Sequence, residues 1–282
     1  MKWYNKYLSV FETPIDEVPL STIDEIRTKL KSKQSPNPIA SVVVIAYNEE
    51  KHLLSCLWSL AETNTKFPIE IIGIDNDSSD RTVDIFKILG MPYFIEYNKS
   101  QGNARNRGQQ EAKGDYYLCI DSDTMYPPGY IDMHLKQLMK PGVAASYSFW
   151  SYVPDKDYPR IWMFFYELFR DIHLIIQSIK RPELSVRGMT FAYNIHFGKK
   201  IGFRLDIKRG EDGSLALGLK KFGKIKLIAN KNARVMTCTS TLKQDGSMFN
   251  AFKIRALKGL RHLGDYFVKK DLYKDDESNL VK

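Results

Sequence analysis

The sequence predicts an α/β protein with a mostly parallel central sheet flanked by helices, and two observations support this fold class. Continuous apolar runs at 41–47, 69–75 and 116–121 are typical of strands that are buried on both faces. The segments between them carry helical apolar spacing, capping residues or a terminal glycine. Repeated strand–helix units of this size favour parallel pairing, because a parallel connection needs a helix-length crossover.

The individual elements follow in chain order. A first helix is expected at 21–32, and the prolines of 35–38 end it. The elements expected next are a strand at 41–47, a helix at 49–63, a strand at 69–75, a helix at 81–89, a strand at 92–97, a helix at 102–114 and a strand at 116–121. After residue 141 the pattern becomes rich in aromatic residues, and a further helix and strand are expected within 209–228.

The chain divides into three parts by composition and pattern. Residues 1–38 are predicted to be an N-terminal extension, 39–240 the main domain, and 241–282 a C-terminal peripheral helical segment with Lys and Arg in excess. The N-terminus has no uninterrupted apolar stretch of signal-peptide length, which predicts a cytoplasmic protein.

Charge and cysteine content set broad limits on function. The net charge of +9 permits nucleic acid, an anionic membrane surface or a phosphorylated substrate as partner, and selects none of them. Cys56, Cys119 and Cys238 form no CxxC pair, and the first two lie in apolar runs. We therefore expect buried free thiols in a reducing compartment.

Segment 161–179 resembles a membrane span in its hydrophobicity, but four polar side chains interrupt it. Glu167, Arg170, Asp171 and His173 would each be costly at bilayer depth, while the apolar residues follow helical spacing. The pattern predicts an amphipathic helix. Its apolar face either packs on the domain or lies at a membrane surface, and packing is the preferred interpretation.

Two aspartates end the strand at 116–121. Asp121 and Asp123 are two residues apart, so an extended backbone points both side chains the same way. Two adjacent carboxylates repel each other unless a cation lies between them. Oxygen ligands suit Mg²⁺ or Mn²⁺, ions that commonly bind together with phosphate.

Four motifs occur together in a fixed order: SVVVIAYNEE, IIGIDNDSSDRT, GNARNRGQQEAKGDYYLCIDSD and RGEDGSLALGLKKFG. Over roughly residues 40–235 the chain resembles the inverting family-2 glycosyltransferases of the GT-A fold. The resemblance implies a Rossmann-like sheet in which 39–125 is the nucleotide-sugar half and 126–240 the acceptor half. It also implies transfer from a nucleoside-diphosphate sugar, and the absence of a QxxRW motif favours transfer of a single sugar.

The resemblance assigns donor-binding positions to the loops after the first two strands. The predicted donor-binding residues there are Ala46, Tyr47, Asn48, Glu49, Asp75, Asn76 and Asp77. Tyr47 would stack on the base. Asn76 stands where many relatives have aspartate, and its amide would still pair with a pyrimidine edge, so a UDP-sugar is preferred over a GDP-sugar. A polar turn that caps a helix is the alternative interpretation of this segment.

The same resemblance places the diphosphate and its metal ion. Arg105 and Asn106 would lie near the diphosphate, where a cation can neutralise its charge. Asp121 and Ser122 would contact the donor, and Asp123, with Asp121, would hold Mn²⁺ or Mg²⁺. Arg105 alone would be interpreted as a solvated helix residue.

Glu211 and Asp212 match the ED motif of the family, which makes Asp212 the implied general base. Acids at a helix N-terminus are also favoured by the helix dipole whatever the function. Relatives often carry a metal-binding histidine on the strand that follows, but 233–241 contains none, and Cys238 is too soft a ligand to favour Mg²⁺ or Mn²⁺. Metal binding without the donor is therefore expected to be weak.

The acceptor side is less determined. Trp150, Trp162 and Arg209 are predicted to shape the acceptor site, although the aromatic residues would equally suit a core beneath a loop. A glycan or lipid-linked glycan acceptor at the inner membrane face would suit the basic residues that precede the ED motif, and it would also suit the amphipathic helix.

Two other function classes stay open, and a nucleic-acid binder is disfavoured because no recognition motif is present. A nucleotidyltransferase on a related scaffold would need a glycine-rich loop after the first strand, and AYNEEKH offers none. A sugar- or nucleotide-binding protein without catalysis stays possible because of Asn76 and the missing histidine.

Overall fold

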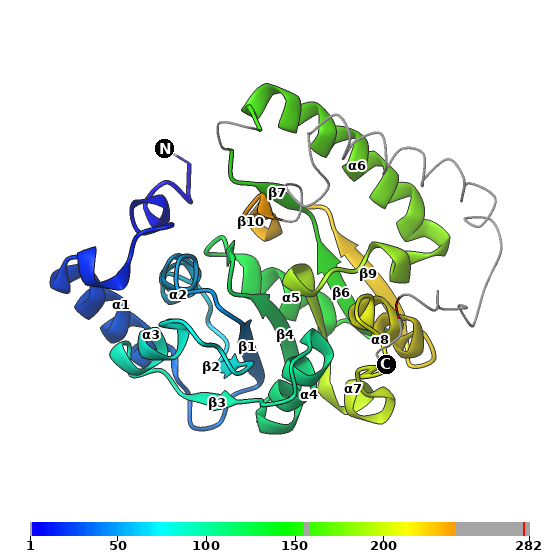
Figure 1. The fold of residues 1–282 in the computed structure, drawn as a ribbon. Coiled ribbons are helices and arrows are strands. Elements are labelled where there is room, and N and C mark those ends of the chain that lie inside the picture. The colour runs from blue at the N-terminus through cyan, green and yellow to red at the C-terminus, as the bar shows by residue number, and fades with distance from the viewer. Residues whose placement is uncertain (1, 155–157, 241–278, 280–282) are drawn as a thin grey trace.

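A seven-stranded sheet forms the centre of the molecule in the computed structural model, which describes residues 2–154, 158–240 and 279 (Figure 1). The strand order is β3-β2-β1-β4-β8-β6-β9. The strands are β1 (Ala40–Ala46), β2 (Ile69–Asp75), β3 (Tyr93–Ile95), β4 (Tyr116–Asp121), β6 (Val143–Ser148), β8 (Phe191–Asn194) and β9 (Lys224–Ile228). Only β8 runs antiparallel to its neighbours β4 and β6, so the predicted mostly parallel sheet is confirmed.

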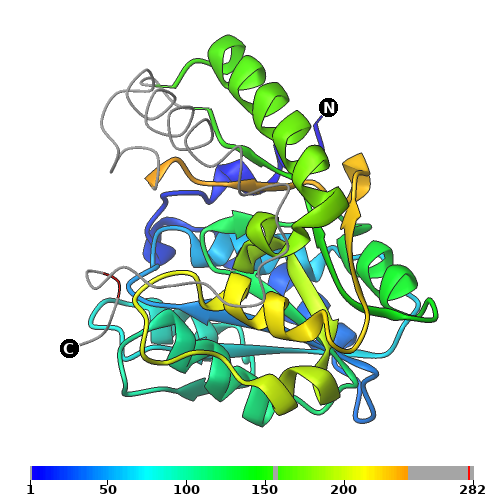
Figure 2. The ribbon, with the colours of Figure 1, turned by 90° about the vertical axis from the view of Figure 1, so that its right-hand side faces the viewer.

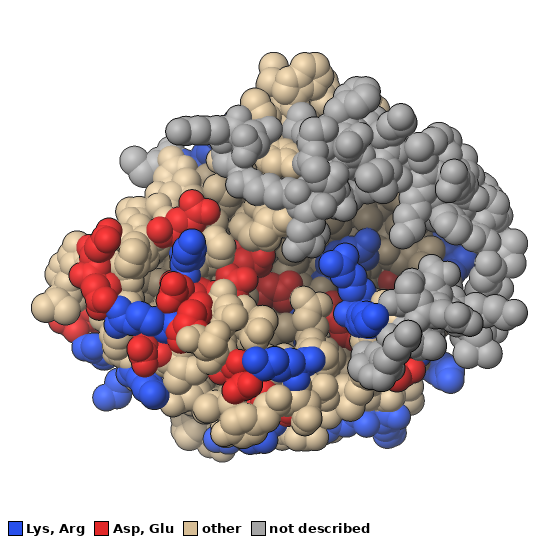
Figure 3. All heavy atoms as spheres, in the orientation of Figure 1, with Lys and Arg blue, Asp and Glu red and all other residues tan. Residues whose placement is uncertain are grey.

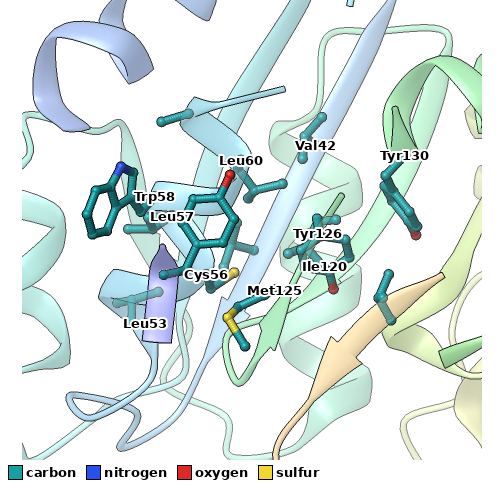
Figure 4. Close-up of a cluster of buried hydrophobic side chains, with 14 of the residues drawn as sticks. Val42, Leu53, Cys56, Leu57, Trp58, Leu60, Ile120, Met125, Tyr126 and Tyr130 are labelled. Atoms are coloured by element: carbon teal, nitrogen blue, oxygen red, sulfur yellow. The ribbon is translucent and has the colours of Figure 1, made fainter. Parts of the chain in front are cut away.

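Helices cover both faces of this sheet. As a result, β1, β2 and most of β4 are buried on both sides. Val42 and Val44 join one core cluster, while Val43 and Ile45 join the other. The helices that contribute to the first cluster are α1 (Leu20–Lys33), α2 (Leu53–Ala61), α3 (Thr82–Ile88), α5 (Tyr130–Leu138) and α6 (Arg160–Lys180). Those that contribute to the second are α4 (Gln101–Glu111), α7 (Ile195–Ile201) and α8 (Glu211–Leu219). Figure 4 shows the first cluster between α2, β1 and β4.

A small second sheet lies beside the end of β4. Its order is β5 (Thr124–Met125), β10 (Val235–Thr237) and β7 (Trp150–Tyr152). Strand β10 pairs with both neighbours, and Thr237 is opposite Thr124. This sheet therefore brings the chain around Cys238 next to the chain around Asp123.

The N-terminal extension packs onto the main domain through α1. Ile23, Ile26 and Leu30 are buried in the same cluster as α2. Within 39–125 every predicted helix and strand is present with small shifts of its ends. The predicted C-terminal helical segment at 241–282 lies outside the described residues, apart from Asn279.

Helix α6 (Arg160–Lys180) confirms that segment 161–179 is helical. It does not confirm the preferred interpretation, in which the apolar face packs on the domain. In Figures 1 and 2 it lies at the periphery beside β7 and β10. Its buried residues are Met163, Leu174 and Gln177. We call its exposed apolar side chains the outer face of α6; they are Ile161, Trp162, Phe164, Phe165, Leu168, Phe169, Ile172, Ile175, Ile176 and Ile179. The expectation that this stripe packs on the domain is wrong, because α6 meets the domain through Met163 and Leu174 and through charged side chains such as Glu167 and Arg170.

Candidate active site

The candidate site lies where β1, β2 and β4 end together. Ala46 is opposite Asp75, and Ile45 is opposite Asp121, so parallel pairing brings three predicted segments to one edge of the sheet. Such an edge is where open α/β sheets bind their ligands. Figure 3 shows acidic side chains in and around a hollow near the middle of the face seen in Figure 1.

The loop after β1 is held in place by the loop after β2. The backbone N–H groups of Asn48 and Glu49 donate to Ser78 Oγ at 2.9 Å and to Thr82 Oγ1 at 2.8 Å. Asn48 has a positive φ of 53°, which an asparagine tolerates. Tyr47 stays 49% exposed, with the ammonium group of Lys99 5.2 Å from its ring centre. Its ring is therefore available for stacking.

Asp75 presents one oxygen that has no partner among the described residues. Its carboxylate is 1% exposed, and Oδ2 accepts a hydrogen bond of 3.0 Å from Ser78 N. Oδ1 is buried and accepts no hydrogen bond from the described part of the chain. A buried carboxylate oxygen is costly without a donor, so this atom indicates a ligand N–H or O–H group. Asp77 is half-buried and pairs with Lys99 at 3.3 Å.

Asn76 has a different task from the predicted one. Its Nδ2 donates to the carbonyls of Glu96 at 2.9 Å and Asn98 at 3.0 Å, and its Oδ1 accepts from Ser100 N at 3.0 Å. Both amide hydrogens are therefore occupied by backbone, and the side chain is 6% exposed. The prediction that this amide pairs with a base edge is corrected: Asn76 fixes the connection from β3 to α4.

Arg105 on α4 bridges two carboxylates. Its Nη2 lies 2.5 Å from Asp121 Oδ1, and its Nε lies 3.4 Å from Asp212 Oδ1. The side chain is 2% exposed, so its charge faces these acids rather than solvent. This geometry corrects the interpretation as a solvated helix residue, while the predicted diphosphate contact stays a prediction, because Nη1 has no partner among the described residues. Arg105 connects the DSD and ED segments, which are far apart in sequence.

Gly188 is part of this cluster, although no sequence motif predicts it. A Cβ at position 188 would overlap the Arg105 guanidinium and would lie 2.7 Å from Asp212 Oδ2. The backbone of the next residue, Met189, lies near Asp121 and favours the charged form of its carboxyl group, which by itself lowers its pKa. Only a glycine lets the chain pass this close to the ion pairs. A prediction from sequence would need to know that 188 lies beside 105, which no local pattern indicates.

The carboxyl groups at this edge hold their protons more tightly than usual. Burial raises the pKa of Asp212 to about 7; Arg105 opposes this shift, while Glu211 and Asp121 add to it. Burial also raises the pKa of Glu211 and of Asp121, for which Arg105 is again the opposing charge. Asp212 is therefore a carboxyl group that can exchange a proton near neutral pH.

Asp123 receives three side-chain hydrogen bonds. The donors are Thr124 Oγ1 at 2.9 Å, Cys238 Sγ at 2.9 Å and Thr237 Oγ1 at 3.4 Å. Burial, and then the nearby charge of Glu49, raise the pKa of Asp123. The carboxylate oxygens of Asp121 and Asp123 are hard ligands, and a divalent cation would offset the repulsion that they share with Glu49. The described residues contain no cluster of three metal-binding side chains, so water and ligand oxygens would have to complete the shell.

Two residues near Asp123 were not predicted as part of the site. Cys238, judged from sequence only as a poor metal ligand, hydrogen-bonds Asp123 directly. His52 Nδ1 lies 2.8 Å from Glu49 Oε2. Burial works against its charged form, but Glu49 and the nearby Asp123 leave the pKa of His52 raised. The N-terminal turn before α2 therefore adds a titratable group to the carboxylate edge.

The remaining predicted residues are scattered. Asn106 is half-buried on α4, and Ser122 is buried between the two aspartates. Trp150 is 5% exposed and packs under the guanidinium of Arg170 at 4.2 Å, so its predicted acceptor contact is replaced by a core position. Trp162 is 61% exposed on the outer face of α6. Arg209 is exposed just before α8, and its backbone N–H bonds Asn279 at 3.1 Å.

Comparison with known proteins identifies the family. Residues 41–197, more than half of the chain, match the sequence profile of "Glycosyl transferase family 2". The chain belongs to this family. It is 32% identical over 109 residues to the putative glycosyltransferase EpsH of Bacillus subtilis, a match that covers 35% of this chain and 30% of EpsH. The chain spans about a third of the length of the curated relatives that it matches. The predicted family and the predicted enzyme class are confirmed.

Solved structures confirm the GT-A fold of this family-2 glycosyltransferase. The mannosyltransferase PcManGT of Pyrobaculum calidifontis, in complex with GDP-Man and Mn²⁺, superposes with a TM-score of 0.56 at 16% identity, covering 85% of this chain and 72% of its own. TarS of S. aureus, in complex with UDP-GlcNAc, gives a TM-score of 0.54 at 21% identity, covering 71% of this chain and 58% of its own.

Proposed function

We propose that this protein transfers a single sugar, with inversion, from a nucleoside-diphosphate sugar to an acceptor hydroxyl. The observation that supports this most is the convergence of Asp121 and Asp212 on the buried Arg105, with Asp123 two residues beyond Asp121. Residues 39–125 would bind the nucleotide sugar, and 126–240 would receive the acceptor. The nucleotide-sugar complexes of TarS and PcManGT, which share the fold, support a donor of this class.

The donor base would lie between Tyr47 and Asp75. The half-exposed Tyr47 ring would stack on it, and the free Oδ1 of Asp75 would accept a base N–H group. Uracil and guanine both carry a suitable imide N–H. The UDP-sugar remains the preferred donor. The residues that would border it are Ala46, Asn48, Glu49 and Asp77.

Asp212 would act as the general base. Once ionised, it takes the proton of the acceptor hydroxyl as that oxygen bonds to the anomeric carbon, and the bond from this carbon to the diphosphate oxygen breaks. Inversion follows, because the attack and the departure occur on opposite faces of the sugar. Arg105 holds Asp212 and Asp121 in position, and burial, with a smaller contribution from Glu211, keeps the pKa of Asp212 high.

Asp123, with Asp121, would hold Mn²⁺ or Mg²⁺. The bound ion would screen the charge that grows on the leaving diphosphate. The two carboxylates fit such an ion in chemistry and in their need for positive charge, and the Mn²⁺ complex of PcManGT supports the assignment. The thiol of Cys238 orients Asp123.

The test is Mn²⁺-dependent release of UDP or GDP from a panel of nucleotide sugars. Wild type is compared with Asp123→Ala and Asp212→Asn, and Asp206→Asn serves as a matched control because Asp206 is an exposed carboxylate on the same segment. We expect Asp212→Asn to bind the donor but to lose about 10³-fold in turnover. Asp123→Ala should lose Mn²⁺-dependent turnover, and Asp206→Asn should behave as wild type. Absence of donor binding in every case would leave the non-catalytic binding protein as the better proposal.

A further inference from the structure

Helix α6 is turned the opposite way from an ordinary surface helix. Its charged side chains face the protein: Glu167 accepts hydrogen bonds from Ser151 Oγ at 2.7 Å and from Tyr152 N at 2.9 Å. Arg170 donates to the carbonyl of Trp150, and Asp171 pairs with Arg234. The apolar side chains of the outer face of α6 point away from these contacts, between 43% and 76% exposed. Surface helices of globular proteins bury the apolar stripe and expose the charges.

Such a face needs an apolar partner. Exposed apolar patches this extensive mark interaction sites, because burying large apolar side chains away from water is favourable. No helix in the described part of the chain is long and apolar enough to cross a membrane. Helix α6 has 21 residues, and its polar side is already bonded to the domain. It can therefore lie flat on an apolar layer but cannot cross one.

Positive charge stands at one end of the same helix. A hollow beside the start of α6 is lined by Lys2, Tyr4, Asn5 and Arg160, among others. The guanidinium of Arg160 donates to Tyr4 Oη at 3.3 Å and remains exposed. Two cations beside an apolar helix face suit the phosphate of a lipid headgroup, and the net charge of +9 favours an anionic surface in general.

We propose that the outer face of α6 lies in the plane of an anionic phospholipid bilayer, with Lys2 and Arg160 at the headgroups. The chain leaving the C-terminal end of α6 reaches Gly188 after eight residues, and Gly188 abuts Arg105 and Asp212. Docking would therefore hold the carboxylate site close to the membrane surface. An acceptor with a lipid anchor fits this placement. The lipid-anchored acceptor rests on the proposed transferase function, whereas the membrane contact does not.

The first test is flotation of the full chain with vesicles of phosphatidylcholine, with and without phosphatidylglycerol. We expect binding that is stronger on the anionic vesicles. The double variant Phe164→Glu/Ile176→Glu should bind at least about tenfold more weakly. Leu20→Glu is the matched control, because Leu20 is 77% exposed on α1, and it should bind as wild type. Arg160→Glu should reduce the preference for anionic vesicles.

Tryptophan fluorescence gives an independent measurement. Of the four tryptophans, Trp162 is on the outer face, Trp58 and Trp150 are 5% exposed, and Trp3 is half-buried next to Lys2. In a Trp3→Phe background we expect a blue shift on addition of anionic vesicles, and its loss when Trp162→Phe is added. Donor hydrolysis measured in detergent-free buffer should be the same in the Phe164→Glu/Ile176→Glu, Arg160→Glu and Leu20→Glu variants, so a failed transferase proposal and a failed docking proposal give different results.

Two outcomes would overturn the proposal. One is the absence of binding to vesicles of either composition by a protein that still binds the donor. The other is a dimer in solution that Phe164→Glu/Ile176→Glu converts to a monomer without any vesicle binding by wild type, since a second copy would then cover the face.

Discussion

The carboxylate site and the outer face of α6 depart from the usual distribution of side chains in opposite directions. At the site, Arg105, Asp121 and Asp212 are largely withdrawn from water and interact with one another. On α6, large apolar side chains remain in water while the charges are turned inward. Both arrangements cost free energy in the isolated chain, and each is understood once a partner is supplied: a charged ligand for the site, an apolar layer for the helix.

The carboxylate site should be sensitive to a single added methyl group. Gly188→Ala places a Cβ against Arg105 and Asp212, and we expect about 10²-fold lower turnover because the base is displaced. Gly129→Ala is the control, since a Cβ there has no neighbour nearer than 3.4 Å. Steady-state donor hydrolysis measures both. Unchanged turnover in Gly188→Ala would mean that Arg105 and Asp212 relax without loss, and that their pairing is not required.

The pH profile should show whether the charge in the site is used in catalysis. Asp212 acts as a base only when ionised, and its pKa is about 7. The value of kcat/KM should therefore rise about tenfold per pH unit below 7 and level off above it. Arg105→Gln removes the opposing positive charge and should move the midpoint upward. A profile that is flat from pH 5 to pH 9, with donor binding unchanged, would contradict the role of Asp212.

Metal binding tests how complete the site is. Cys238→His puts a neutral imidazole next to Asp123, and we expect about tenfold tighter Mn²⁺ binding in the absence of donor, measured by calorimetry. Cys238→Ser keeps a hydrogen-bond donor to Asp123 and should bind Mn²⁺ as weakly as wild type. Tight Mn²⁺ binding by the wild-type protein would show that the shell is already complete.

The smallest effect is expected on α6. Ile175→Ala should change the free energy of unfolding by less than about 0.5 kcal/mol, because Ile175 is 46% exposed. Ile74→Ala is the matched change in the sheet, where Ile74 is fully buried, and should cost about 2–5 kcal/mol. Denaturant unfolding without lipid compares the two. A large loss in Ile175→Ala would mean that the outer face is covered within the protein itself.

The sequence was sufficient for the parts of the fold that depend on local pattern. The runs that became β1, β2 and β4 are buried on both faces, so their continuous apolar character identified them as strands. Parallel order then brought Asp75 and Asp121 to one edge. The orientation of α6 was not predictable, because helical periodicity shows that two faces differ but not which face meets the protein.

The missed site residues share a different cause. Gly188 and Cys238 join the site through long-range contacts, with Arg105 and Asp123 respectively, and neither lies in a motif. Arg105 was predicted as a site residue, but its pairing with Asp121 and Asp212 was not, since its burial depends on the loop that contains Gly188. Motifs therefore indicated the chemistry of the site, and tertiary packing decided which groups neutralise one another.

The amide of Asn76 limits how this sequence can vary during evolution. It joins three backbone groups between residues 96 and 100, using both of its hydrogens. An aspartate at 76 would turn acceptors toward the carbonyls of Glu96 and Asn98 and would repel them. Exchange of this residue therefore requires a compensating change in the 96–100 connection. We expect position 76 and this connection to covary among related chains, as a signature of descent that is independent of catalysis.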